Sequence, residues 1–196
     1  MTKGKVYIIS DLKFFDEERK NKAGYKTFEQ MNRTVIEKWN KLVKPEDQVI
    51  LMGITGVGSF DEMESVISQL NGKLIITSSH MNELFSKDEW RKMGITFFWD
   101  ISVFNSYPDG REALYLIKPL EEKDKEYYKE TYALLVVDSD NPIEGEMPIK
   151  DNMLSVDALR WDYLPLDTDE LLTIYENMKL FQEMESTETR KDITEG

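Results

Sequence analysis

Three short apolar runs alternate with segments of helical periodicity in the first 78 residues, and this order limits what the chain can fold into. The runs lie at residues 5–10, 48–52 and 73–78. Short apolar runs bounded by turn-forming residues are typical of buried strands. When such strands alternate with helices along a chain, the strands usually lie parallel in one sheet and the helices cross over its faces. The sequence therefore predicts a parallel sheet in its first half.

Three motifs mark where helices begin. The segments 27–30, 59–62 and 86–89 each place a glutamate or glutamine three residues after a serine or threonine, which is the pattern of a capping box. Pro45 marks the end of the first helix, because proline does not continue a helix. The first two helices are expected to bury Met31, Val35, Trp39 and Leu42, and Met63, Val66, Ile67 and Leu70. Residues 15–26 are predicted to form a charged loop.

From Ile95 onward the pattern changes to strand-like runs separated by turns such as 108–110. These runs lie at residues 96–98, 102–107, 112–117, 133–137 and 153–156. Short runs of this kind predict a second sheet, mixed or antiparallel. We expect the two sheets to form one domain over residues 1–184, followed by a flexible polar tail at 185–196.

A last helix is predicted to open at Asp167, with Glu170 three residues later as in a capping box. One face of this helix carries Leu171, Ile174, Tyr175, Met178 and Phe181. An apolar helix face usually packs into a core. The alternative is that this face docks a partner, because it lies next to an acidic tail.

The composition restricts the functional classes. The chain has 196 residues, of which 40% are apolar, and it has no cysteine. It also lacks an apolar stretch of the roughly 20 residues that a membrane span needs. These features argue against global disorder, a membrane span, a disulfide framework and a thiolate metal site, and they suit a cytoplasmic protein.

The formal net charge of −13 favours some partners over others. An acidic surface repels nucleic acid and anionic lipid and attracts a basic protein. We therefore expect a basic protein partner, with no direct binding to nucleic acid or membrane. The alternative is that the charge serves only solubility.

Several scaffold motifs appear in an order typical of one protein family. They are Asn32–Asn40 (asparagine, then Val-Ile and Trp-Asn), Val43–Asp47, Leu70–Lys73, Asn152–Ala158 and Tyr163–Leu166. In this order, over roughly residues 5 to 175, the chain resembles the calcineurin-like metallophosphoesterases, particularly the small bacterial and phage-encoded members. The resemblance implies an α/β fold of two packed mixed sheets flanked by helices, a four-layer sandwich, with an extra C-terminal helix in this chain. It also implies a dinuclear metal site at the strand ends, where metal ions clamp a phosphate and activate a hydroxide.

The metal ligands of this family are mostly replaced. Its Asp-x-His motif corresponds here to Asp11-Leu12-Lys13, its Gly-Asp motif to Gly53-Ile54, and its Gly-Asn-His motif to Ser78-Ser79-His80. The later histidine motifs correspond to a position near Ile117 and to Asp138-Ser139-Asp140. An ammonium or an aliphatic side chain has no lone pair to give to a divalent cation. The vestigial positions are Asp11, Lys13, Ile54, Ser79, His80, Ile117, Asp138 and Asp140.

Two functional interpretations of these positions remain open beside simpler ones. The lone histidine His80 could protonate a leaving group, or it could be a retained loop residue that hydrogen-bonds its surroundings. Asp11, Asp138 and Asp140 could form an oxygen-only Mg²⁺ or Ca²⁺ site, or they could be solvated loop acids with Asp11 paired to Lys13. The glycine-rich segment 53–58 lacks the ending of a phosphate-binding P-loop and is predicted to be a turn.

The sequence therefore predicts a catalytically inactive phosphoesterase-fold protein that binds another protein and needs no cofactor. By analogy, we expect it to be phage-encoded, to reside in the cytoplasm of a bacterial host and to inhibit transcription through the RNA polymerase sigma factor. The alternative is a metal-dependent phosphodiesterase with a rearranged carboxylate-rich site. A purely structural role is a third possibility, for which the sequence offers no positive sign.

Overall fold

The computed structural model of the protein describes residues 4–77, 84–95, 97–99, 103–116, 122–139, 143–145 and 147–194. Within these residues the chain forms two five-stranded sheets. The first has the order β10-β1-β2-β3-β4, with bounds Leu166–Asp167, Val6–Ser10, Gln48–Met52, Lys73–Thr77 and Phe97–Trp99. The second has the order β5-β6-β7-β9-β8, with bounds Val103–Ser106, Glu112–Leu116, Leu134–Val137, Met153–Ser155 and Ile149–Lys150. Each sheet combines parallel and antiparallel pairs, so the predicted fold class is confirmed.

The parallel strands of both sheets end near one another. In the first sheet, Ser10 at the end of β1 pairs with Met52 at the end of β2. In the second sheet, Val137 at the end of β7 pairs with Ser155 at the end of β9. A parallel bridge between Ser10 and Asp157 joins the two sheets at these ends. Residues that follow the strands are therefore brought together at one edge of the molecule.

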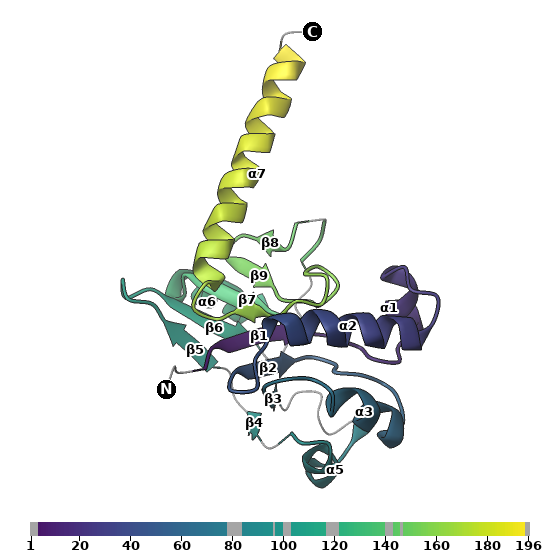
Figure 1. Ribbon diagram of the computed structural model, residues 1–196. Coiled ribbons are helices and arrows are strands. Elements are labelled where there is room, and N and C mark those ends of the chain that lie inside the picture. Colours follow the sequence, from purple (N-terminus) through teal and green to yellow (C-terminus); the bar gives the residue numbers. More distant parts are fainter. Residues whose placement is uncertain are drawn as a thin grey trace.

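Most of the helices lie on the outer faces of the two sheets, and the last one projects away from the body (Figure 1). Their bounds are Glu17–Lys22 for α1, Phe28–Leu42 for α2, Phe60–Ile67 for α3, Lys87–Lys92 for α5, Glu122–Thr131 for α6 and Leu171–Thr194 for α7. One apolar cluster packs α2, α3 and α5 against the first sheet, and its largest fully buried side chain is Trp39. A second cluster fills the space between the sheets, and a third lies on the outer face of the second sheet beside Tyr128 of α6. The layers are thus helices, sheet, sheet and helix.

Side-chain caps set the helix starts that the sequence predicts. Ser59 and Ser86 form complete capping boxes with Glu62 and Glu89. The hydroxyl of Thr27 accepts a hydrogen bond from the Gln30 N–H at 3.1 Å. Each cap satisfies N–H groups that the first turn of a helix leaves without an intrahelical partner.

Two elements differ from the prediction in the first and last parts of the chain. The predicted charged loop 15–26 contains helix α1, whose start is capped by the Asp16 carboxylate with the Arg19 N–H at 2.6 Å. The last helix does not open at Asp167, because residues 166–167 form β10, antiparallel to β1. Thr168 reinforces this pairing through hydrogen bonds from its N–H and its hydroxyl to the Val6 carbonyl. Helix α7 therefore begins at Leu171.

Helix α7 is longer than the sequence predicts, and less of it is buried. Its backbone runs through Thr194, across most of the segment predicted as a polar tail. Leu171 and Tyr175 are buried as expected, but Phe181 is 53% exposed. Phe181 was therefore wrongly expected on the buried face. Beyond its first turns, α7 projects away from the body (Figure 1). Among the described residues, no helix has the length and apolarity needed to cross a membrane.

Candidate functional site

The predicted site positions that the structure describes come together at the edge where the strands end. Asp11 follows β1, Ile54 follows β2 and Asp138 follows β7. The Lys13 N–H donates to the Ile54 carbonyl at 3.1 Å, and Ser139 donates to the Asp11 carboxylate. The first two strand-end loops and the loop after β7 are thus in direct contact. His80, Ser79, Ile117 and Asp140 lie outside the described residues.

Asp11 is the centre of this contact. Its side chain is fully buried, and its two carboxylate oxygens accept hydrogen bonds from three donors. The Ser139 N–H donates to Oδ2 at 2.9 Å, while the Ser139 hydroxyl and the Ile54 N–H donate to Oδ1 at 2.8 and 3.3 Å. A buried carboxylate is costly unless it is paired and hydrogen-bonded. In this chain protein donors already meet that need.

Lys13 supplies the nearby positive charge. Its Nζ lies 3.8 Å from Asp11 Oδ1, and its side chain is 23% exposed. The expected pairing of Asp11 with Lys13 is therefore confirmed. Because the ammonium faces the buried carboxylate, its positive charge offsets part of the cost of burying that carboxylate.

The backbone around Asp11 has an unusual conformation. Asp11, Lys13 and Phe15 have φ angles of 53°, 49° and 64°, a left-handed region that non-glycine residues seldom adopt. Gly53, with φ of 60°, approaches so closely that a Cβ there would lie 2.7 Å from Asp11 Oδ1. Glycine is therefore required at position 53 for both its conformation and its size. Strained backbone of this kind persists where the surrounding structure holds it.

The described residues do not offer the donor set of the expected dinuclear metal site. Lys13 and the aliphatic Ile54 have no lone pair to donate, and the Asp11 oxygens are occupied by protein donors. Across the described ranges, no group of three or more histidine, cysteine, aspartate or glutamate side chains is placed to hold a metal ion. Asp11 and Asp138 are both buried, so the expectation that they are solvated loop acids is wrong. The third member of the proposed oxygen-only site, Asp140, lies outside the described residues.

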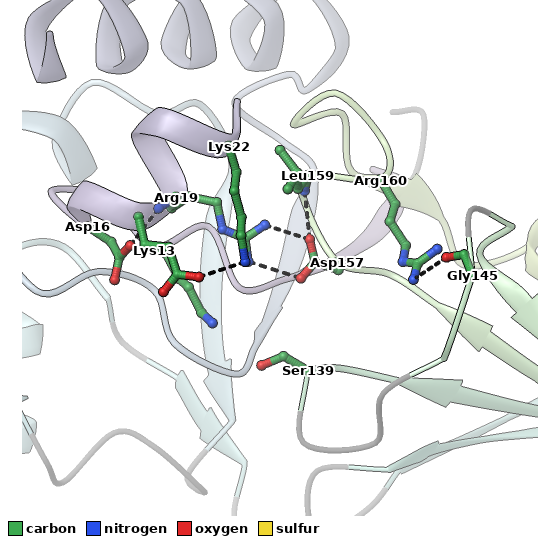
Figure 2. Close-up of a pocket in the computed structure, with 10 residues that line it drawn as sticks. Lys13, Asp16, Arg19, Lys22, Ser139, Gly145, Asp157, Leu159 and Arg160 are labelled. Atoms are coloured by element: carbon green, nitrogen blue, oxygen red, sulfur yellow. Dashed lines mark hydrogen bonds and ion pairs between the residues drawn. The ribbon is translucent and has the colours of Figure 1, made fainter. Parts of the chain in front are cut away.

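A cavity of about 550 Å³ opens beside Lys13 and Ser139 (Figure 2). It lies at the strand ends, which is where open α/β sheets usually bind ligands. Its lining consists mainly of charged side chains and comprises Lys13, Asp16, Glu18, Arg19, Lys22, Ser139, Gly145, Asp157, Leu159 and Arg160. The sequence interpretation missed Arg19, Asp157 and Arg160.

Arg19 and Asp157 form a bidentate ion pair across the cavity wall. Arg19 Nη1 donates to Asp157 Oδ1 at 2.7 Å, and Nη2 donates to Oδ2 at 3.0 Å. Burial alone would lower the pKa of Arg19, but the hydrogen bond and charge of Asp157 outweigh it and raise the pKa. Asp157 also accepts from the Leu159 N–H at 2.8 Å. The pair therefore ties α1 to the loop that follows β9.

Arg160 stabilises the opposite wall of the cavity. Its guanidinium donates to the carbonyls of Ile143, Gly145 and Met147 at 2.6, 3.2 and 2.9 Å. Figure 2 shows it directed toward Gly145, away from the Arg19–Asp157 pair. This side chain therefore holds the chain segments before β8.

The charges of the cavity largely neutralise one another. Lys13 faces Asp11, Arg19 faces Asp157, and Lys22 lies 2.7 Å from Glu18. These ion pairs connect the loops and helix α1 to one another. They leave no concentration of one sign of charge among these residues to attract a ligand. The arrangement can hold the strand-end loops in one conformation, and the Asp11 carboxylate is already engaged.

Tyr163 lies next to this network and gives it a pH dependence. Burial, opposed by the charge of Arg19, raises the pKa of Tyr163 from 10.0 to about 12. Because the folded state disfavours the phenolate, the free energy of unfolding is expected to fall as the pH rises from 10 to 12. Within the described part of the chain, the Tyr163 hydroxyl has no hydrogen-bond partner.

We therefore expect Tyr163→Phe to have little effect at pH 7 and to remove part of the alkaline loss, about 1 kcal/mol by pH 11. Urea unfolding of both proteins at pH 7, 9 and 11 measures this difference. A constant difference between them across this range would contradict the assignment.

Comparison with solved structures supports the fold. No protein-family model matches the sequence, and no curated protein matches it. A protein of unknown function from Aquifex aeolicus, AQ665, superposes with a TM-score of 0.60 at 19% identity, over 87% of this chain and 99% of that chain. The two proteins share a fold. A novel archaeal phosphodiesterase gives a TM-score of 0.42 at 16% identity, over 86% of this chain and 87% of that chain. At these identities, the likeness to AQ665 concerns the fold alone.

Proposed function

We propose that this chain is a phosphoesterase-like protein that has lost catalysis and acts by binding another protein. The observation that carries the proposal is the state of the Asp11 carboxylate. It is buried, accepts hydrogen bonds from Ser139 and Ile54, and faces the Lys13 ammonium. Metal catalysis of phosphoester hydrolysis needs such a carboxylate to hold the ion. Here the same side chain joins the loops of the two sheets.

The partner that we propose is a basic protein. The chain carries a formal net charge of −13, and complementary charge increases the rate and specificity of association. Nucleic-acid-handling proteins carry basic surfaces. We propose that the chain is phage-encoded, that it works in the bacterial cytoplasm, and that it inhibits transcription by binding the RNA polymerase sigma factor.

Two measurements on the purified protein test this proposal. The first follows hydrolysis of bis(p-nitrophenyl) phosphate with Mn²⁺ or Mg²⁺, and titrates both metals calorimetrically. We expect no turnover and no stoichiometric metal binding. Turnover that needs metal and is lost in Asp11→Ala would contradict the proposal and favour a phosphodiesterase using Asp11, Asp138 and Asp140.

The second measurement titrates the protein against purified sigma factor and follows transcription by the RNA polymerase holoenzyme. We expect a saturable complex that weakens as salt is raised, because surface charge interactions are screened. We also expect transcription to fall as the complex forms. The absence of binding at low salt would reject the sigma factor as the partner.

A further inference from the structure

The projecting part of helix α7 carries a patch of large exposed apolar side chains. Leu180, Phe181 and Met184 are 59%, 53% and 64% exposed. Residues three and four positions apart are neighbours on a helix surface, so Met184 lies beside both of the others. Single exposed apolar residues are ordinary, but a contiguous patch marks an interaction surface. These three residues are called the α7 patch below.

The first two turns of α7 are firmly attached to the body. Leu171, Leu172 and Tyr175 are buried in the core between the sheets. The Tyr175 hydroxyl donates to the Asp151 carbonyl at 2.5 Å. The α7 patch is therefore presented on a helix with a fixed base, and a preorganised element loses little conformational freedom on binding.

An ion pair also attaches the second turn of α7 to the body. Arg111, in the turn between β5 and β6, pairs with Glu176 of α7 and also with Asp109. Beyond this point α7 runs away from both sheets (Figure 1). Within the described residues, no other element lies alongside the projecting part. The body of the protein therefore leaves the α7 patch accessible.

The charge around the α7 patch indicates the kind of surface that would cover it. Glu176 is paired with Arg111, and residues 177–188 contain three further glutamates and one lysine. A second copy of the chain would bring the same acidic surplus to the contact, whereas a groove rimmed by lysine or arginine would neutralise it. Leu180, Phe181 and Met184 stand at i, i+1 and i+4, which places them on one side of the helix, and a helix with an apolar side of this kind binds in an apolar groove.

We propose that the α7 patch is the docking surface of this protein and inserts into an apolar groove, rimmed by basic side chains, on its protein partner. This inference rests on the proposed function and adds the surface that performs it. The strand-end site then has a structural role, and recognition occurs on the projecting part of α7.

The test compares three forms of the full-length chain. The first is the wild type and the second carries Leu180→Gln, Phe181→Gln and Met184→Gln. The third is a matched control that carries Val57→Gln and Tyr127→Gln, because these residues are exposed apolar side chains outside α7. Glutamine supports helix formation, and circular dichroism checks that α7 is retained. Binding to purified sigma factor is measured by calorimetry, and capture from a bacterial lysate is quantified for all three forms.

The proposal predicts that the triple variant binds at least about tenfold more weakly, as expected when central apolar contacts are removed. It predicts that the control binds as the wild type does. Equal binding of the triple variant and the wild type would overturn the docking surface and leave the proposed function standing. If the wild type binds neither the sigma factor nor a basic lysate protein, both fail. A wild-type dimer that the triple substitution converts to a monomer would overturn the inference in favour of a second copy.

Discussion

Replacing Asp11 with alanine is expected to lower the free energy of unfolding by about 3 kcal/mol, even after all divalent metal has been removed. The substitution leaves the part-buried N–H groups of Ser139 and Ile54 without their acceptor, and it leaves Lys13 without its carboxylate. An unsatisfied buried donor costs about 1–3 kcal/mol. The left-handed conformation at position 11 adds to the loss, because alanine adopts it less readily than aspartate.

Urea unfolding in EDTA, followed by circular dichroism, measures this effect. Asp11→Asn is the matched variant, because its amide oxygen still accepts one of the hydrogen bonds, and it should be destabilised less than Asp11→Ala. Asp61→Ala changes an exposed aspartate, and it controls for the loss of charge.

A metal ligand would behave in the opposite way. Carboxylates gathered to bind a cation repel one another when the cation is absent. Removing one of them therefore raises the free energy of unfolding of the metal-free protein. If Asp11→Ala leaves the stability in EDTA unchanged or raises it, and abolishes stabilisation by added Mn²⁺, Asp11 is a metal ligand and the structural role is wrong.

The sequence predicts the sheets well because their signals are local. The apolar runs that became β1, β2 and β3 are bounded by turn residues, and the serines at 59 and 86 cap the helices that follow. The convergence of Asp11 and Ile54 also follows from sequence, because they lie one and two residues after the ends of β1 and β2, and neighbouring parallel strands end at the same edge of a sheet. The strand pattern alone therefore locates the candidate site.

The missed elements depend on contacts between distant parts of the chain. Helix α1 has only polar and charged residues, so its sequence shows no apolar periodicity. Its residue Arg19 pairs with Asp157, which lies 138 positions later in the chain. β10 is a two-residue strand whose pairing with β1 is set by the tertiary fold. Phe181 follows the same helical spacing of apolar residues as Tyr175. That spacing predicts which side of a helix is apolar, but it does not show how far along the helix the body of the protein extends to cover that side.

The Arg19–Asp157 pair is expected to be the second large contributor to stability. Arg19→Met keeps most of the aliphatic stem but leaves the largely buried Asp157 carboxylate without its partner. Breaking a buried ion pair from one side costs about 3–5 kcal/mol. Because Asp157 is 16% exposed in its side chain, we expect a loss at the lower end of this range, about 3 kcal/mol, for Arg19→Met. The change should be accompanied by easier proteolysis within α1, which the pair holds against the loop after β9.

A double-mutant cycle separates the pair from the individual side chains. Asp157→Asn keeps an acceptor for the Leu159 N–H. The stability that this variant loses therefore reports mainly the missing negative charge. If the two residues act as a pair, Arg19→Met combined with Asp157→Asn destabilises the protein by clearly less than the two single losses added together. Additive losses would mean that Arg19 stabilises α1 through packing alone. In that case the Arg19–Asp157 ion pair would not be what fixes α1 against the strand ends.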